Sequence, residues 1–215
     1  MAKGKDAFNY ALFKLKFASI KFENKKIKKY WENLIPEIIE KKIEREIENN
    51  AQKVELEFNN NNLFSNEKKP KIIICKNTIE LNSEAEVILE ASSGEDCARL
   101  LCISHIIAQR FATSIYLIIS QECLESNLSS KPEYIPLPPE YVIRDKTWKP
   151  DIIKINHPAI SFKRIRFGKG KGPRDQAKLL IISHGKSSLK INNILDSSRA
   201  DNIRHLELQT LKPVS

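Results

Sequence analysis

Residues Ala85–Gln121 read AEVILEASSGEDCARLLCISHIIAQRFATSIYLIISQ. Glu86–Ala91 is rich in β-branched and apolar residues, which predicts a strand. Ser92, with Glu95 three residues later, forms a capping-box pattern that predicts the start of a helix. Apolar residues then recur at spacings of three and four around most of the helix, so we expect it to be buried. Ser114–Ser120 is apolar on both faces and predicts an interior strand.

Strand patterns flank this unit on both sides. They show either alternation of apolar and polar residues or a short apolar run. These patterns fall at residues 13–17, 53–58, 71–76, 151–155, 159–167 and 177–183. Leu189–Leu195 and Ile203–Leu211 are only weakly patterned, and they yield no firm prediction.

A strand–helix–strand unit must pack against a further layer. A helical stripe of apolar residues from 24 to about 49, interrupted by Pro36, offers one. We therefore predict an α+β fold, a mixed β-sheet covered by two main helices at 24–49 and 95–111, with a basic C-terminal extension. The predicted regions are an α+β core at 1–120, a proline-rich surface connection at 121–150 and a basic β-hairpin region at 151–215 that completes the sheet.

The positive charge is concentrated in one segment. The chain of 215 residues has a net charge of +9 and a pI of about 9.3. Residues 141–186 hold 12 Lys and Arg against 3 Asp, net +9. Residues 1–140 hold 20 basic and 21 acidic residues, net −1, and residues 187–215 hold 4 and 3, net +1. A balance this basic favours an acidic partner, and this segment is where we expect the partner to bind.

A predicted nucleic-acid-binding site lies at the end of the strand 159–167 and in the loop that follows. Its cations neutralise phosphates and release counterions, an aromatic residue stacks on bases, and glycines let the backbone approach phosphates. The loop Gly168–Arg174 is not a Walker loop, because it lacks both the spacing and the Lys-Ser/Thr ending. The predicted contact residues are Lys163, Arg164, Arg166, Phe167, Lys169, Lys171 and Arg174.

Residues 85–125 resemble the second half of Alba-like nucleic-acid-binding proteins, a group that includes small subunits of RNase P and RNase MRP. The resemblance rests on the strand EVILEA, the turn at Gly94, the helix ending IIAQRF and the strand SIYLIIS. The turn reads Ser-Ser-Gly-Glu-Asp, which is acidic where the family has a basic, glycine-rich turn. The resemblance implies a two-layer α+β domain that binds RNA, often with a partner subunit, and it assigns no catalytic residue.

Other chemistry has weaker signals. Ser183 and His184 end a predicted strand as half of a hydrolase site would, although the chain has no Gly-x-Ser-x-Gly elbow. Four cysteines without Cys-x-x-Cys spacing predict buried, reduced thiols, and we expect no metal and no cofactor. No apolar run approaches the roughly 20 residues of a membrane span, and no secretory signal is present, so we expect an intracellular protein that does not enter membranes.

Three functions are consistent with these patterns. The first is a non-catalytic RNA-binding subunit of a ribonucleoprotein particle, with RNA and other protein subunits as partners. The second is a protein-interaction scaffold or an accessory subunit of a larger complex, which would use the proline-rich segment and the basic strand against an acidic protein. The third is a hydrolase that uses Ser183 and His184.

Overall fold

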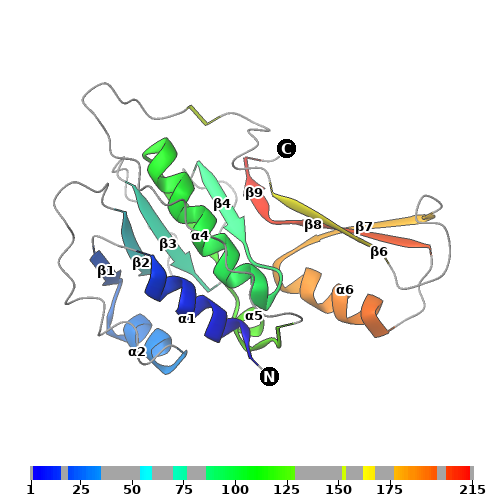
Figure 1. The fold of residues 1–215 in the computed structure, drawn as a ribbon, viewed down its shortest axis with the longest axis horizontal. Helices are drawn as coiled ribbons and strands as arrows, with labels where there is room; N and C mark the ends of the chain where they lie inside the picture. The colour runs from blue at the N-terminus through cyan, green and yellow to red at the C-terminus, as the bar shows by residue number, and fades with distance from the viewer. Residues whose placement is uncertain are drawn as a thin grey trace.

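Two β-sheets organise the chain, a larger one with helices over one face and a smaller one that projects from its end (Figure 1). The smaller sheet extends well beyond the body formed by the larger one. The computed structural model describes residues 2–15, 19–34, 54–59, 70–76, 86–128, 152–153, 162–167, 177–197 and 202–213.

The larger sheet has six strands in the order β1-β2-β3-β5-β4-β9. Its first five strands run parallel, and β9 pairs antiparallel with β4 at the edge. The middle strands are buried on both faces, which explains why their sequences are almost continuously apolar. The strands are β1 (Ser19–Phe22), β2 (Glu55–Asn59), β3 (Lys71–Cys75), β4 (Val87–Glu90), β5 (Ser114–Ile118) and β9 (Thr210–Lys212).

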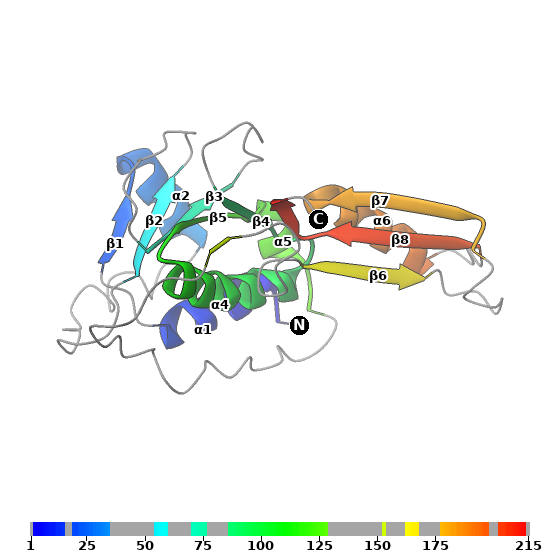
Figure 2. The ribbon, with the colours of Figure 1, turned by 90° about the horizontal axis from the view of Figure 1, so that it is seen from above.

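Among the described residues, four helices contribute side chains to the core on one face of this sheet (Figure 1). They are α1 (Gly4–Lys14), α2 (Lys25–Leu34), α4 (Gly94–Phe111) and α5 (Gln121–Glu125). Figure 2 shows two of them, α1 and α4, lying side by side across that face. In register across the sheet, Leu56, Ile72 and Ile115 point into the same core as the helix side chains Phe8 and Trp31. This shared core fixes the position of α4 across the strands.

The start of α4 differs from the capping box predicted at Ser92 and Glu95. The N-cap is Ser93, whose hydroxyl accepts a hydrogen bond from the Asp96 backbone N–H at 3.3 Å. Ser92 is fully buried instead, with its hydroxyl between two carboxylates. The cap is therefore shifted by one residue, because Ser92 is used to join α4 to the smaller sheet.

The smaller sheet has the order β6-β8-β7, with β6 (Lys163–Phe167) antiparallel and β7 (Leu179–His184) parallel to β8 (Ile203–Leu208). Helix α6 (Gly185–Ser197) follows β7 directly and covers one face; Figure 2 looks at the opposite face, with α6 behind the strands. The chain passes from β8 into β9 through Gln209, so one bent segment belongs to both sheets. The N–H groups of Gln209 and Thr210 both donate to the carbonyl oxygen of Phe162 at 3.1 Å.

The predicted α+β class with a mixed sheet is confirmed, as are the strands of the central unit and the helix predicted at 95–111. The strand predicted at 13–17 is wrong, since Phe13 and Lys14 end α1, whose inner side chains Phe8, Leu12 and Leu15 have helical spacing. Of the helix predicted at 24–49, Lys25–Leu34 is described. Its remainder, and residues 129–150 of the proline-rich segment, lie outside the described residues.

Candidate functional site

Two of the predicted RNA-contacting cations bind carboxylates of the chain itself. An Arg164 Nη atom lies 2.8 Å from Asp96 Oδ1, and Arg166 Nε lies 2.6 Å from Glu207 Oε1. Asp96 and Glu207 are fully buried, so the two arginines help to neutralise negative charges in the interior. Their guanidinium groups therefore have a structural role between β6, α4 and β8.

The other predicted contacts are not gathered with these arginines. Lys163 is exposed and lies one residue before Arg164 on the same strand, so it points to the opposite face of the sheet. Lys169, Lys171 and Arg174 and the side chain of Phe167 lie outside the described residues. RNA binding by this segment stays a prediction, and the described part of the segment splits its cations between two faces.

The inner cluster is a network of charges around Ser92. The Ser92 hydroxyl lies 3.0 Å from Asp96 Oδ2 and 2.9 Å from Glu207 Oε2, and it can donate to only one of them at a time. Arg99 also pairs with Asp96, at 2.9 Å. Burial by itself would raise the pKa of Asp96, but the Arg164 and Arg99 guanidinium groups outweigh it and hold that pKa below its ordinary value.

This network predicts a loss of stability in acid. Because the pKa of Asp96 is lowered by folding, its carboxylate stabilises the fold above the ordinary aspartate pKa of about 3.9, and this contribution is lost as the pH falls below that value. We expect the difference in unfolding free energy between the wild type and Asp96→Asn to be large at pH 7 and to shrink below about pH 4. Urea unfolding of both proteins across this range measures it, and a difference independent of pH would contradict it.

Ser183 and His184 do not form the pair proposed from the sequence. The Ser183 hydroxyl lies 2.7 Å from His205 Nε2, whereas His184 Nδ1 lies 2.5 Å from Glu90 Oε2 at the end of β4. Neighbouring residues on a strand point to opposite faces, so adjacent positions rarely act together. His205 was missed because Ile203–Leu208 is weakly patterned, yet its alternation places His205 and Glu207 on one buried face.

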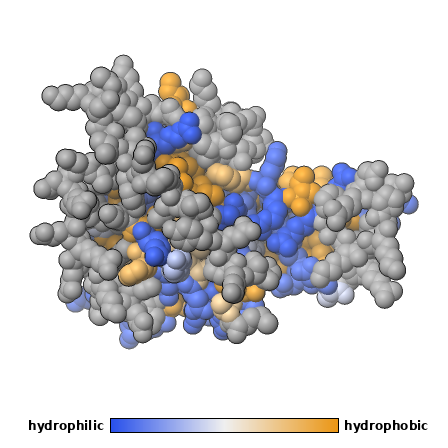
Figure 3. All heavy atoms as spheres, in the orientation of Figure 1, coloured by the Kyte–Doolittle hydropathy of each residue, from blue (hydrophilic) through white to orange (hydrophobic). Residues whose placement is uncertain are grey.

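The face of the smaller sheet that α6 does not cover carries an apolar row. Ile165, Leu206 and Ile182 are directly opposite one another on the three strands, so their side chains share this face. Ile165 is 56% exposed and Ile182 57%, and Leu180, on the same face, is 54% exposed. Figure 3 shows hydrophobic side chains at the surface of this projecting part, next to hydrophilic ones. We call Ile165, Leu180, Ile182 and Leu206 the open face.

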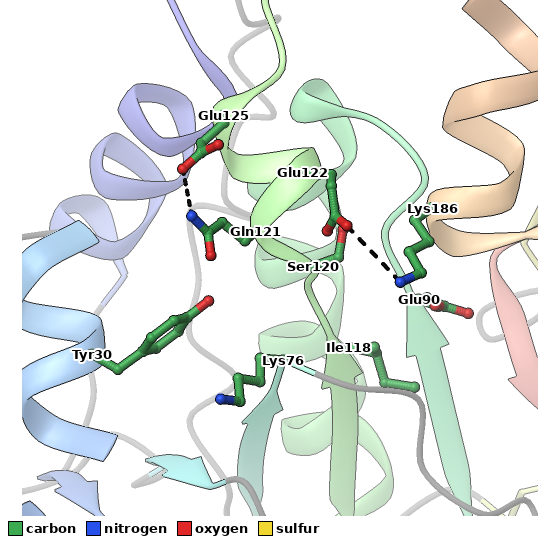
Figure 4. Close-up of a pocket in the computed structure, with 9 residues that line it drawn as sticks. All are labelled: Tyr30, Lys76, Glu90, Ile118, Ser120, Gln121, Glu122, Glu125 and Lys186. Carbon is green, nitrogen blue, oxygen red and sulfur yellow. Dashed lines mark hydrogen bonds and ion pairs between the residues drawn. The ribbon is translucent and has the colours of Figure 1, made fainter. Parts of the chain in front are cut away.

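A cavity of about 500 Å³ lies at the carboxyl ends of β3, β5 and β4 (Figure 4). This edge is where ligands bind in open parallel sheets, at the point where the strand order reverses. Side chains from α2, α5 and α6 line the cavity around the strand ends. The lining residues are Tyr30, Lys76, Glu90, Ile118, Ser120, Gln121, Glu122, Glu125 and Lys186.

The cavity has a mixed electrostatic lining. Lys76 Nζ lies 4.8 Å from the centre of the Tyr30 ring, and Lys186 Nζ lies 3.9 Å from Glu122 Oε1. Burial raises the pKa of Tyr30, and the carboxylates of Glu122 and Glu125 raise it further. Burial also raises the pKa of Glu90. Two ammonium groups opposite three carboxyl groups favour a small polar molecule over a strongly charged one.

The described residues offer little support for a cysteine nucleophile or for a metal-binding site. All four cysteines are free and buried, as the sequence predicted. Burial raises the pKa of Cys75 to about 12 and those of Cys102 and Cys123 to about 11, so their thiols are poor nucleophiles at neutral pH. In the described ranges no three His, Cys, Asp or Glu side chains are placed to hold a metal ion. No helix within these ranges is both long and apolar enough to cross a membrane.

No protein-family model and no curated protein matches the chain. Among solved structures, the chain is similar to "2-oxoglutarate:ferredoxin oxidoreductase from Magnetococcus marinus with 2-oxoglutarate, coenzyme A and succinyl-CoA bound", with a TM-score of 0.53 and 9% sequence identity. The match covers 99% of this chain and 54% of that one, so the chain spans about half the length of this structure. At 9% identity the similarity concerns the fold alone. The resemblance of residues 85–125 to Alba-like proteins is not tested by it and stays a prediction.

Proposed function

We propose that the chain is a protein-interaction subunit that binds an acidic, partly apolar surface of another protein with its open face. The observation that carries this proposal is the exposed row Ile165, Leu206 and Ile182 across all three strands. Ile165, Leu180 and Ile182 are each more than half exposed around the partly exposed Leu206, and such a set of large aliphatic side chains on a projecting sheet is typical of a surface that a partner covers.

The charge around the open face supports an acidic partner. Lys163 and Lys178 are exposed beside it, and Arg204 lies two residues from Leu206 on the same side of β8. The only carboxylate in the sequences of β6, β7 and β8 is Glu207, which is buried on the inner face. A partner with acidic groups around an apolar centre would complement this distribution.

The charges and the aliphatic side chains of the open face argue against two other binding partners, a second copy of the chain and RNA. A second copy of the chain would bring like charges together, because lysines and arginine border the open face on both copies. RNA bases stack best on aromatic rings, and the described side chains of the open face are aliphatic. The following experiment distinguishes binding of an acidic protein from binding of RNA and from self-association.

The test compares aspartate substitutions at two isoleucines of similar exposure. Ile182 lies on the open face, and Ile194, 62% exposed on α6, is the matched control. In nuclease-treated extract of its own cells, we expect the tagged chain to elute from a sizing column in a complex larger than the monomer. Ile182→Asp should release the monomer, and Ile194→Asp should not. Release by nuclease alone, by detergent alone, or equally by both substitutions would contradict the proposal.

A further inference from the structure

A series of hydrogen bonds links a hydroxyl to a carboxylate on the inner face of the smaller sheet. The Ser183 hydroxyl lies 2.7 Å from His205 Nε2, and His205 Nδ1 lies 2.9 Å from Asn192 Oδ1. Asn192 Nδ2 in turn lies 2.9 Å from Glu207 Oε1. The four side chains come from β7, β8 and α6, and the network is separate from the open face.

The acceptor at the end of the series fixes the direction of each hydrogen bond. The Glu207 carboxylate, paired with Arg166, only accepts, so the amide nitrogen of Asn192 faces it and the amide oxygen faces His205. That oxygen also only accepts, so His205 carries its proton on Nδ1 and presents the lone pair of Nε2 to Ser183. Ser183 therefore donates its proton to His205 and accepts one from Ser188, whose hydroxyl lies 2.7 Å away.

This is the arrangement of an activated hydroxyl, with a base beside it and a group that orients the base. His205 and Asn192 are buried, whereas Ser183 is only partly buried, so Ser183 is the most exposed residue of the three. Burial lowers the pKa of His205, which keeps the imidazole neutral at pH 7 and able to take a proton. The first turn of α6 reaches the same hydroxyl through Ser188.

The geometry points to Ser183 as a nucleophile that accepts acyl groups from activated esters or thioesters. Ser183 Oγ forms a bond to the carbonyl carbon while its proton passes to His205 Nε2. The bond from that carbon to the leaving oxygen or sulfur breaks, and the alcohol or thiol departs with the proton. Water then attacks the serine ester, giving the carboxylic acid and restoring the hydroxyl. This inference keeps the serine of the sequence hypothesis and replaces His184 with His205.

The probe for this activity is p-nitrophenyl acetate, an activated ester, applied to the full chain. We expect release of p-nitrophenolate together with an acetyl group on the peptide that contains Ser183, identified by mass spectrometry. Ser187, exposed in the first turn of α6, is the internal control and should stay unmodified. Ser183→Ala should abolish the acetylation, and Ser187→Ala should leave it unchanged. Acetylation confined to lysines, or unchanged in Ser183→Ala, would overturn the inference.

A purely structural network would also hold α6 on the sheet, so the test needs a readout that packing does not alter. His205→Gln should lower the acylation rate roughly 100-fold, the usual contribution of a general base. Should that variant fail to fold, the pH profile of the wild type decides. Its acylation rate should rise with pH to a plateau, with a midpoint below the ordinary histidine pKa of about 6.5. A rate that climbs in proportion to hydroxide without a plateau would overturn the inference.

Discussion

Arg166→Met should lower the free energy of unfolding by about 3 kcal/mol, because it leaves the buried Glu207 carboxylate without its closest cation. For a chain of this length, a loss of that size lowers the melting temperature by roughly 6–12 °C. Arg164, at 3.8 Å from Glu207, and the hydroxyl of Ser92 remain, so the loss should stay near the lower end of the range for broken buried pairs. Thermal unfolding followed by circular dichroism measures it.

Lys163→Met is the matched control, since Lys163 lies on the same strand but points to the opposite, exposed face. We expect its free energy of unfolding to change by no more than about 0.5 kcal/mol in either direction, as is usual for surface substitutions. The pair also separates a structural arginine from an RNA contact. If Arg166→Met melted like the wild type and instead weakened RNA binding with a shallower salt dependence, Arg166 would be a phosphate contact and not a partner of Glu207.

Gly185→Ala should destabilise the protein by about 3 kcal/mol. Gly185 joins β7 to α6 with a φ of +52°, a left-handed conformation that costs other residues roughly 1–2 kcal/mol. A Cβ atom there would meet the carboxyl group of Glu90, at 2.0 Å from Oε1 and 2.3 Å from Cδ. Glu90 is buried and bonded to His184, so it cannot move aside without losing that bond. Urea unfolding measures the loss.

A double variant separates the two causes of this effect. In Glu90→Ala/Gly185→Ala the clash is gone and only the backbone strain persists, so the double variant should be less destabilised than the sum of the two single variants. Simple additivity would mean that the approach of Gly185 to Glu90 has no energetic consequence. This contact matters for the fold because it fixes the end of the smaller sheet against β4 of the larger one.

Local patterns predicted the central unit well. The strand, helix and strand of residues 85–121 each have a clear period over their own length, and burial then confirms what the period indicates. The strand predicted at 13–17 was wrong because that pattern is too short to define a period. A short alternating pattern cannot tell a strand from the end of a helix, and the longer spacing of Phe8, Leu12 and Leu15 is that of a helix, which ends at Lys14.

Local patterns predicted strands that overlap β6 and β7, but not which face of the smaller sheet is buried, because its faces are set by residues distant in sequence. Arg164 pairs with Asp96, 68 residues away, and Arg166 with Glu207, 41 residues away. From the sequence, Arg164 and Arg166 on β6 were predicted to be exposed phosphate contacts. In the structure the arginines face inward to buried carboxylates and Ile165 faces solvent, which reverses that interpretation.

The most direct test of the proposed function is a photo-crosslinking amino acid at position 182, compared with the same amino acid at position 194. In nuclease-treated extract, position 182 should crosslink to one acidic protein and position 194 should not. That protein, once purified, should bind the wild type at least roughly tenfold more tightly than Ile182→Asp, the change expected for a residue central to an interface. Crosslinks from position 182 to RNA, to lipid or to a second copy of the chain, or equal crosslinking from both positions, would contradict a protein-binding open face.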